Sequence, residues 1–455
     1  MRSFIRTRSM CEWEDFPARE GFARDALRKD ERLSPFLLLS EPGFTAAEQR
    51  RCAETWMRGR IAAAAAGRES LGRQSVRKQG SRIRLGYLSN DFQEHATAML
   101  LIETLEAHDR GQFELHAYSY GGADAGKMRQ RCVEVFDGFT PIGGLTDAQA
   151  GQAIHDDGID ILIDLKGFTR DTRTSILALR PAPVQVNFLG YPGTLGSDLC
   201  DYLITDSFVT PRTSAADYAE SLAFLPHSYQ PRGRAATPAA PLGRASAGLP
   251  DQGFVFCCFN QAFKFTPEVF ALWCRLLNAV ENSVLWLLAA PQAEGNLRNE
   301  AWNHGIDGDR LVFAPDVGQI EHLRRLQLAD LVLDTSPYGA HTTASDALWA
   351  GVPVVTRPSA TFASRVAGSL LHAVGLPELI VASDEDYFEL ALALARDPGK
   401  LAALRRKLAA NRATAPLFDV PAYTLALEDL FRQMESRRRA HLLPTEIGAL
   451  SGAAA

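Results

Sequence analysis

The sequence predicts an α/β protein built from two doubly wound, Rossmann-like domains, and three features of the chain support this fold class. From Arg82 onward short apolar segments alternate with helical ones, the alternation resumes near residue 251, and a stretch rich in Pro, Ala and Gly separates the two series. Strands that alternate with helices are typical of parallel sheets covered by helices on both faces. A chain of 455 residues, 46% of them hydrophobic, is long enough for two or three domains with cores of their own.

Residues 1–80 are predicted to form a helical N-terminal segment. Two stretches, PAREGFARDALRKD and TAAEQRRCAETWMRGRIAAAA, carry apolar residues at helical spacing. Residues 82–230 follow as the first Rossmann-like lobe, with strands expected at RIRLGYLS, FELHAYS, DILIDL, VQVNFLG, YLITD and LAFLP. Residues 231–250 carry no periodic apolar face and are expected to connect the lobes.

Residues 251–397 form the second predicted Rossmann-like lobe. Its strands are expected at GFVFCCFN, SVLWLLA, RLVFA and LVLD, with helices between them. Residues 398–440 follow as helices that we expect to pack back on the first lobe.

The composition of the chain argues against several classes of binding partner and site. The net charge of −6 argues against a nucleic acid or an anionic membrane as the main partner. Neither a membrane-spanning apolar run nor an apolar segment after the basic N-terminal residues is present, which predicts a cytoplasmic protein. The seven cysteines include no C-x-x-C pair, and we expect no metal site. Asp384–Asp386 matches a D-x-D metal pattern but opens an expected helix, where acidic residues are favoured.

The segment at residues 330–357, DLVLDTSPYGAHTTASDALWAGVPVVTR, reads as strand, turn, helix and strand. The helix begins near His341, and its first N–H groups lack partners and carry partial positive charge, so Thr342 and Thr343 suit a diphosphate. Asp346, one turn later, could bond a ribose hydroxyl. The alternative is structural, with the threonines as ordinary N-cap residues and the histidine satisfied within the turn.

Other polar residues of the second lobe follow predicted strands. Gln261 and Lys264 come after GFVFCCFN, at the edge where ligands of such sheets bind. A lysine ammonium suits phosphate oxygens, although most lysines are simply solvated. His322 and Arg325 in EHLRR have i, i+3 spacing and share one helix face, which is either a nucleoside contact or an ordinary polar surface.

Two features of the first lobe could face a substrate. His95 lies in the loop after the first strand, in SNDFQEHA, and an imidazole of near-neutral pKa could take the proton of a hydroxyl group. LGYPGT forms a tight turn after a later strand, which a purely structural role explains equally well.

Six ordered motifs between residue 82 and about residue 435 resemble the protein O-GlcNAc transferase family, which includes the Spindly branch and has the GT-B fold. The motifs are SNDFxxH, GFT at Gly167–Thr169, LGYPGT, FNQxxK, EHLRRxQLAD and HTTxxDALWAG. CEWEDF in the N-terminal segment is similar to the stretch that joins tetratricopeptide repeats to the family's catalytic core. A full array of such repeats does not fit into the residues before the core.

The resemblance implies roles for individual residues. Catalysis would involve Lys264 at the diphosphate and His95 on the acceptor side, as base or as a positioning group. UDP-sugar binding would involve Gln261, His322, Arg325, His341, Thr342, Thr343 and Asp346. The sugar and acceptor cleft between two facing lobes would include Gly190, Tyr191, Pro192, Gly193, Thr194 and Tyr338.

The chain departs from the animal members of the family at several positions. Tyr338 stands where they have a cysteine beside the N-acetyl group, and Gln319 stands where they have a lysine near the base. Asp160, with Asp157 just before it, replaces a histidine, and Met99 replaces another. Asp157 and Asp160 could lie at the cleft or simply begin a strand.

The function implied by the resemblance is an inverting, metal-independent glycosyltransferase without a cofactor. It would transfer N-acetylglucosamine from UDP-GlcNAc to serine or threonine hydroxyls of protein or peptide acceptors. One alternative is a Spindly-type protein O-fucosyltransferase that uses GDP-fucose, although that branch lacks the counterparts of His341 and Asp346. The other alternative is a non-catalytic protein that binds a nucleotide sugar.

Overall fold

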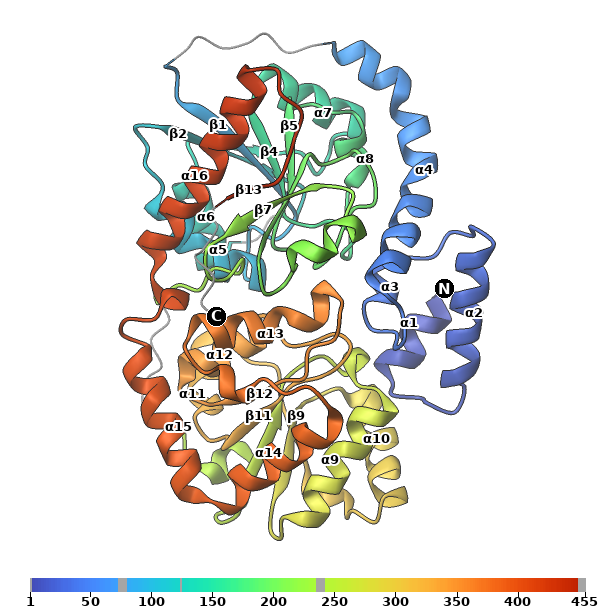
Figure 1. Ribbon diagram of the computed structural model, residues 1–455, viewed down its shortest axis with the longest axis vertical. Coiled ribbons are helices and arrows are strands. Elements are labelled where there is room, and N and C mark those ends of the chain that lie inside the picture. Colours follow the sequence, from blue (N-terminus) through green and yellow to red (C-terminus); the bar gives the residue numbers. More distant parts are fainter. Residues whose placement is uncertain (1, 73–79, 123–124, 235–241, 449–455) are drawn as a thin grey trace. The chain divides into compact units, whose positions relative to one another are not determined.

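The chain folds into two compact units, each built around one parallel sheet (Figure 1). A computed structural model describes residues 2–72, 80–122, 125–234 and 242–448. The eight-stranded unit comprises Ala26–Leu38, Phe44–Gly233 and Asp419–Ala455, and the five-stranded unit comprises Met1–Asp25, Leu39–Gly43 and Arg234–Phe418. The predicted fold class, α/β with two Rossmann-like domains, is confirmed.

The eight-stranded unit has a fully parallel sheet with the strand order β13-β7-β6-β5-β4-β1-β2-β3. The order reverses between β1 and β4, and ligands of doubly wound sheets bind at the carboxyl ends of the strands near such a point. The strands are β1 (Ile83–Ser89), β2 (Phe113–Ser119), β3 (Gly138–Pro141), β4 (Ile161–Asp164), β5 (Val184–Asn187), β6 (Tyr202–Asp206), β7 (Ser221–Leu225) and β13 (Ile447–Gly448).

Helices lie between these strands along the chain, and several have clear start signals. Thr45 and Thr146 each form a capping box with the residue three positions later, which satisfies the first N–H groups of α4 and α7. The helices of this unit are α3 (Pro35–Leu38), α4 (Ala46–Leu71), α5 (Ala96–Ala107), α6 (Lys127–Val135), α7 (Asp147–Asp156), α8 (Thr174–Ala178), η1 (Arg212–Asp217) and α16 (Val420–Arg439).

The five-stranded unit repeats this arrangement with the parallel order β10-β9-β8-β11-β12. The order reverses between β8 and β11, so the loops after these strands meet at one edge. The strands are β8 (Val255–Cys258), β9 (Val284–Leu288), β10 (Leu311–Ala314), β11 (Leu331–Leu333) and β12 (Val354–Val355). The helices are α1 (Arg2–Ser9), η2 (Arg244–Ala247), η3 (Ala262–Lys264), α9 (Pro267–Ala279), α10 (Pro291–Asn303), η4 (Gly308–Arg310), α11 (Gln319–Leu326), α12 (Thr342–Ala350), α13 (Phe362–Ala373), η5 (Pro377–Leu379), α14 (Asp384–Arg396), α15 (Pro398–Asn411) and η6 (Pro416–Phe418).

The central strands of both sheets are buried, and most of them are apolar. β4, β5, β6, β8 and β11 are buried along their whole length. Helices on both faces of a parallel sheet exclude water from both faces, which explains why β8 and β11 are entirely apolar and why the polar Gln185 and Asn187 side chains of β5 are hydrogen-bonded. The same feature made them recognisable in the sequence.

The N-terminal segment is helical but does not form a separate region. Met1–Asp25 and Leu39–Gly43 belong to the five-stranded unit, whereas Ala26–Leu38 and the residues from Phe44 belong to the eight-stranded unit. α2 (Phe16–Arg28) therefore spans the boundary. The expected segment of residues 1–80 is thus shared between the two units, and residues 73–79 lie outside the described residues.

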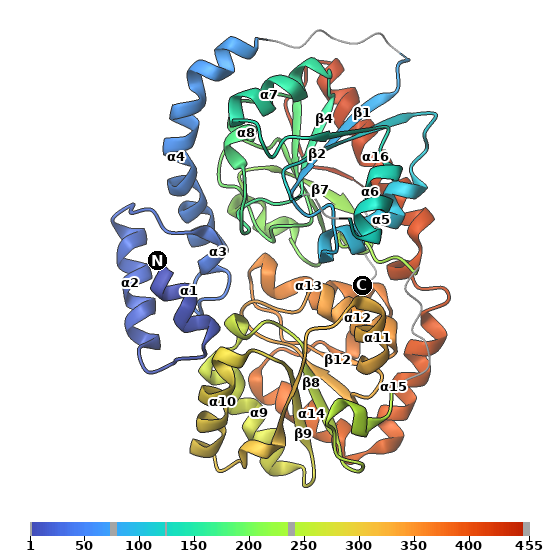
Figure 2. The ribbon, with the colours of Figure 1, turned by 180° about the vertical axis from the view of Figure 1, so that it is seen from behind.

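The helices expected over residues 398–440 are also divided. α15 contacts α14 and stays with the five-stranded unit, whereas α16 packs on α5 and β7 in the eight-stranded unit (Figure 2). The reason is a buried polar chain: Glu428 of α16 accepts from His108 Nδ1 over 3.0 Å, and His108 Nε2 lies 3.2 Å from the Tyr87 hydroxyl. Of the expected connector 231–250, residues 235–241 lie outside the described part, and η2 occupies part of the remainder.

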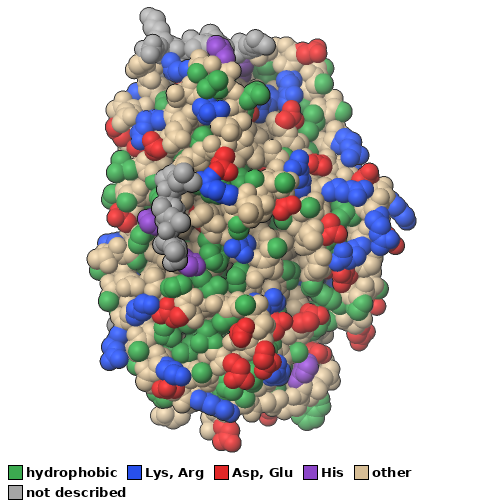
Figure 3. Space-filling view, viewed as in Figure 1, with side chains coloured by type: hydrophobic (Ala, Val, Ile, Leu, Met, Phe, Trp, Pro, Cys, Tyr) green, Lys and Arg blue, Asp and Glu red, His purple; other side chains and the backbone are tan. Residues whose placement is uncertain are grey.

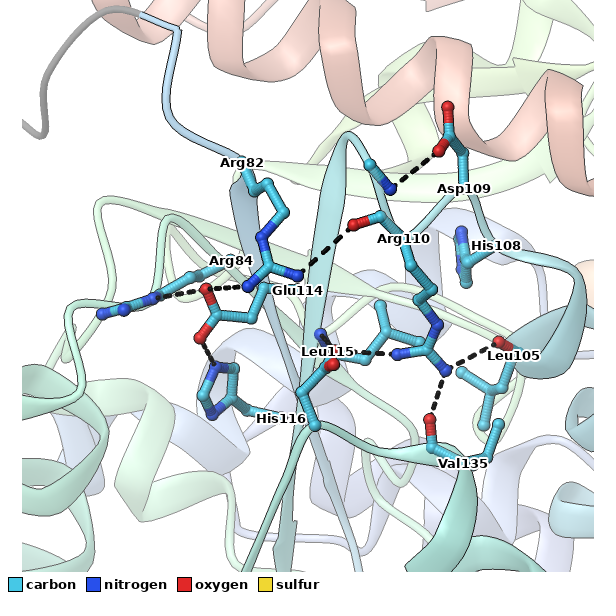
Figure 4. A network of polar contacts seen from close by, with 12 residues as sticks. Arg82, Arg84, Leu105, His108, Asp109, Arg110, Glu114, Leu115, His116 and Val135 are labelled. Carbon is cyan, nitrogen blue, oxygen red and sulfur yellow. Dashed lines mark hydrogen bonds and ion pairs between the residues drawn. The ribbon is translucent and has the colours of Figure 1, made fainter.

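Charged side chains form a network at one end of β2 (Figure 4). Glu114 accepts hydrogen bonds from Arg82 over 3.4 Å and from His116 Nε2 over 2.9 Å, and its carboxylate lies 3.2 Å from the Arg84 guanidinium. Burial by itself would raise the pKa of Glu114, but these contacts outweigh it and lower the pKa. The network supports the start of the first strands and lies away from their carboxyl ends.

Acidic and basic side chains are interspersed over the molecular face in Figure 3. Within the described ranges, no helix combines the length and the apolar character that crossing a bilayer requires.

Candidate active site

The end of β8 carries the lysine of the candidate site. The strand leads into η3, and Lys264 Nζ donates to the carbonyl of Gly339, in the loop after β11, over 2.8 Å. Nζ also lies 3.9 Å from the centre of the Tyr338 ring, within the range of a cation–π contact. Burial lowers the pKa of Lys264 to about 8, and the negative charge of Asp334 opposes this shift.

Asp334 holds the loop between β11 and α12. Its carboxylate accepts hydrogen bonds from the N–H groups of Thr335 and Ala340, over 2.7 and 2.6 Å, and from the Thr356 hydroxyl over 2.6 Å. Burial raises the pKa of Asp334 to about 6, although these hydrogen bonds and the ammonium of Lys264 act in the opposite direction. The carboxylate thus fixes the loop and stabilises the charged form of the lysine.

A chain of hydrogen bonds connects the start of α12 to the end of β8. The Thr343 hydroxyl donates to Asn260 Oδ1 over 2.6 Å, Asn260 Nδ2 donates to the Thr335 hydroxyl over 2.8 Å, and that hydroxyl donates to the Tyr338 carbonyl over 2.6 Å. The first N–H groups of a helix have no acceptor within it and carry partial positive charge. These groups and the Lys264 ammonium therefore occur at the same edge of the sheet.

His341, which precedes α12, is neutral. Its Nε2 lies 3.0 Å from the Ala363 carbonyl, and because a carbonyl only accepts, the ring proton is on Nε2. Burial and the Lys264 ammonium lower the pKa of His341 to about 3. The ring therefore offers an acceptor at Nδ1 and leaves the positive charge to the lysine.

The side chains expected at the nucleoside lie along α11 and α12. Arg325 Nη2 donates to His322 Nδ1 over 3.0 Å, so the ring proton of this histidine is on Nε2, 4.0 Å from the Asp346 carboxylate. Gln319 Nε2 donates to Asp346 Oδ1 over 3.3 Å. The Arg325 guanidinium lies 4.6 Å from the centre of the Phe259 ring, which also borders His322. The arrangement presents an aromatic face, two cationic or N–H groups and a carboxylate.

The predicted nucleotide-sugar residues therefore occupy connected positions in one unit. They lie in or next to η3, along α11 and around the N-terminus of α12: Gln261, Lys264, His322, Arg325, Tyr338, His341, Thr342, Thr343 and Asp346.

His95 belongs to the eight-stranded unit and is the N-cap residue of α5. Its Nδ1 accepts the Thr97 N–H over 3.2 Å, which places the proton of the neutral ring on Nε2. Asp91 lies 3.5 Å from Nδ1 and forms a buried ion pair with Lys166 at 2.9 Å. Burial lowers the pKa of His95, Asp91 opposes this shift, and Lys166 adds to it. The neutral ring thus presents a donor, not a lone pair, at Nε2.

The LGYPGT turn, Gly190–Thr194, follows β5 and is held from inside the same unit. Glu220 accepts hydrogen bonds from the Thr194 hydroxyl over 2.5 Å and from the Leu195 N–H over 2.8 Å. Glycine is required at Gly190, because a Cβ there would lie 1.8 Å from a backbone carbonyl oxygen. The Tyr191 ring packs edge-on against a phenylalanine. These contacts support the structural reading of the turn and orient the backbone that any ligand would meet.

Several polar residues that hold these groups in place were not among those predicted from the sequence. They are Asp91, Lys166, Glu220, Asn260 and Asp334. The signal available in the sequence was their position, because most of them come directly after a buried strand. Most of their partners are distant along the chain, so these hydrogen bonds had no local signature.

Two acidic features have structural roles. The Asp157 carboxylate accepts from the Tyr118 hydroxyl over 2.7 Å, and Asp160 accepts the Arg84 N–H over 2.9 Å. Both precede β4 and therefore lie at the amino end of that strand, which fits the reading that they begin a strand. Asp384 opens α14 and pairs with Arg357 at 2.6 Å. Among the residues that the structure describes, no cluster of three or more His, Cys, Asp or Glu side chains is arranged to hold a metal ion.

Comparisons with known proteins cover most of the chain. The family model described as glycosyl transferase family 41 matches residues 69–232 and 237–427. A probable UDP-N-acetylglucosamine–peptide N-acetylglucosaminyltransferase of Arabidopsis thaliana, SEC, is 40% identical over 79% of this chain and 38% of its own length. The SPINDLY protein of Petunia hybrida, which has the same description, is 33% identical over 78% of this chain and 38% of its own length.

A solved structure is similar to both units. A mutant of the Thermobaculum terrenum O-GlcNAc transferase is 31% identical, with a TM-score of 0.79 over 89% of this chain and 76% of that chain. This similarity agrees with the GT-B fold. The chain spans about two fifths of the length of the curated relatives named above. Because the family model and these relatives together match both units, the chain belongs to glycosyl transferase family 41.

Proposed function

We propose that the protein is an inverting glycosyltransferase that transfers N-acetylglucosamine from UDP-GlcNAc to serine or threonine hydroxyls of proteins. Membership of glycosyl transferase family 41 supports this proposal, as do the peptide N-acetylglucosaminyltransferase names of its relatives. The activity is proposed for this chain because it spans only part of those relatives.

The observation that carries the proposal is the shared position of Lys264 and the start of α12. Transfer breaks the bond between the anomeric carbon and the diphosphate oxygen, so negative charge grows on the departing UDP. The Lys264 ammonium and the N–H groups at Thr342 and Thr343 are donors that suit this charge. Together they can perform the charge stabilisation without a metal ion.

The remaining polar groups suit the other parts of the donor. Asp346 is placed to accept from ribose hydroxyls, and the Phe259, His322 and Arg325 cluster offers a flat surface and N–H groups for a base. Neutral His341 can accept a hydroxyl of the sugar at Nδ1. Tyr338, which contacts Lys264, would border the sugar.

Nucleotide binding tests the donor directly. We expect UDP to bind in calorimetry and GDP to bind at least tenfold more weakly, roughly the effect of losing one good hydrogen-bonded recognition group. Incubation with UDP-GlcNAc and peptides rich in serine and threonine should then give products heavier by one N-acetylhexosamine in mass spectrometry. A preference for GDP, with transfer of deoxyhexose, would instead identify a Spindly-type fucosyltransferase. Binding of UDP-GlcNAc without either transfer or hydrolysis would identify a nucleotide-sugar-binding protein.

The affinity for UDP should depend on pH through Lys264. The pKa of this group is lowered to about 8, so the ammonium is present below pH 8 and is lost as the pH rises through that value. UDP stabilises the charged form, and we expect its association constant to fall by roughly tenfold per pH unit above about pH 8. Calorimetry between pH 7 and 9.5 in buffers of different ionisation enthalpy should also show proton uptake. Lys264→Met is the control, and its affinity should lack this dependence.

Substitution of His95 distinguishes a donor from a base. Since Nε2 carries the proton, we propose that His95 donates a hydrogen bond to the acceptor or the sugar. His95→Gln keeps a donor at similar reach and should retain kcat within about tenfold, whereas removal of a general base costs roughly 10²- to 10⁴-fold. His95→Asn, which preserves an N-cap for α5, controls for folding by thermal melting. A loss above 10²-fold in well-folded His95→Gln, on the scale of a lost base, would assign the base role instead.

A further inference from the structure

The N-terminal segment packs against the turn that carries Lys264. α1 contacts η3, and the Cys11 thiol lies 3.6 Å from the Ala262 carbonyl. Asn296 of α10 donates to the Met10 carbonyl over 2.8 Å. These contacts place the segment within the five-stranded unit and beside the candidate site, where no motif in the sequence had placed it.

Arg8 makes the most specific of these contacts. Its side chain is 2% exposed, and its Nε donates to the Phe263 carbonyl over 3.1 Å. Nη2 donates to the Ser40 carbonyl over 2.6 Å, and the guanidinium lies 3.6 Å from Glu41, which is also buried. The same group lies 5.1 Å from the centre of the Phe16 ring. One guanidinium therefore joins α1, the segment at Leu39–Gly43 and η3.

Stability alone is a weak explanation for this arrangement. Burial removes both charges from water, which lowers the pKa of Arg8 and raises that of Glu41, and the attraction between them offsets only part of this cost. An apolar pair of similar volume often gives equal or greater stability. What an apolar pair cannot provide is a directional hydrogen bond to a backbone carbonyl.

That carbonyl belongs to the peptide unit between Phe263 and Lys264. The Lys264 N–H on the same peptide donates to the Gln261 carbonyl over 2.9 Å, so both polar groups of the peptide have fixed partners. The orientation of this peptide determines the direction in which the Lys264 side chain leaves the turn. A displacement of about 1 Å at a reacting group is enough to reduce a rate strongly.

We infer that Arg8 is a positioning residue, which holds the Phe263–Lys264 peptide so that the lysine ammonium points at the diphosphate of the donor. The inference rests on the proposed function, because it gives Lys264 its role at UDP. It assigns the N-terminal segment a part in donor binding in addition to its part in the fold.

A double-mutant cycle tests whether Arg8 acts through Lys264. The combined change Arg8→Met/Glu41→Leu removes both charges and should leave the melting temperature unchanged or higher. In the wild-type background we expect UDP affinity by calorimetry to fall roughly tenfold, as the ammonium loses its alignment. In the Lys264→Met background the same change should alter the affinity by less than about twofold.

The matched control is Arg24→Met/Glu20→Leu. This pair, at 2.8 Å, belongs to the same N-terminal segment, and Arg24 also donates to the Gly43 carbonyl over 2.8 Å. It should leave UDP affinity unchanged in both backgrounds. If Arg8→Met/Glu41→Leu has a lowered melting temperature, Arg8→Lys replaces it, since lysine keeps the charge opposite Glu41 but lacks the planar fork of donors with which Arg8 holds the Ser40 and Phe263 carbonyls. The same dependence on Lys264 is then expected, with a smaller loss.

The possible results separate the inference from the function on which it rests. No loss of affinity on changing Arg8, or an equal loss in both backgrounds, would overturn the positioning role while leaving the role of Lys264 intact. Unchanged UDP affinity in Lys264→Met alone would contradict the proposed role of Lys264 and the positioning role with it.

Discussion

Lys264→Met should reduce the rate of transfer by about 10²- to 10³-fold, the usual effect of removing one group that stabilises developing negative charge. Methionine has a similar length and fills the space under the Tyr338 ring, but it cannot donate to the diphosphate. The loss should appear in kcat as well as in UDP affinity, because the charge on UDP increases as its bond to the sugar breaks. Transfer to a peptide and slow hydrolysis of UDP-GlcNAc, both followed by mass spectrometry, measure the effect.

Lys407→Met is the matched control for this prediction. Lys407 belongs to the same unit, is 46% exposed and pairs with Glu378 on the surface, so its loss should leave transfer unchanged. A Lys264→Met protein with full activity would contradict the proposed charge stabilisation.

A further change, Thr343→Val, should weaken UDP binding because it breaks the hydrogen bond to Asn260 that joins α12 to β8. Thr343→Ser should retain that bond.

Glu428→Ala should destabilise the eight-stranded unit by about 3–5 kcal/mol, the effect expected when one partner of a buried polar pair is removed. The side chains of Glu428 and His108 are 1% and 0% exposed, and the same carboxylate accepts the Asp109 N–H over 2.7 Å. Its loss leaves the buried His108 ring N–H and the partly buried Asp109 N–H without this acceptor, and it opens a cavity between α16 and α5. Denaturant unfolding followed by circular dichroism measures the change.

Two further variants of α16 serve as controls for Glu428→Ala. Asp429→Ala removes a carboxylate that is 58% exposed and should change stability by less than about 0.5 kcal/mol. Glu428→Gln keeps an acceptor oxygen and should recover part of the lost stability.

The stabilisation by Glu428 should depend on pH. Burial would raise the pKa of Glu428, but the hydrogen bonds from His108 and the Asp109 N–H outweigh it and lower the pKa. The stabilisation is therefore present above the pKa of the unfolded chain, near 4.5, and is lost as the pH falls through the lower folded value.

Local patterns in the sequence were sufficient to predict the fold class and to single out candidate donor-binding residues. Strands buried on both faces are apolar throughout, so β8, β11 and their neighbours stood out, and the residues that follow them were predicted to meet at one edge. The contact between Lys264 and the loop before α12 agrees with that expectation. The roles of these residues toward UDP stay predictions until the variants are measured.

Protonation states and supporting partners were decided only by the tertiary structure. His341 and His95 have the same side chain in the sequence, yet burial and a carbonyl make the first a neutral acceptor at Nδ1, while a backbone N–H makes the second a donor at Nε2. The pKa of Lys264 depends on burial and on Asp334, which lies 70 positions later.

The sequence by itself determined that this chain forms two Rossmann-like units and that a lysine and a helix N-terminus each follow a strand of the second unit. Only the tertiary structure showed that the N-terminal segment packs on the lysine's turn through Arg8, and that α15 and α16 belong to different units. The physical reason is the distance along the chain between the residues that interact. Strand and helix periodicity reflects neighbours within a few residues, whereas hydrogen bonds between buried groups depend on which distant segments the packed core brings together.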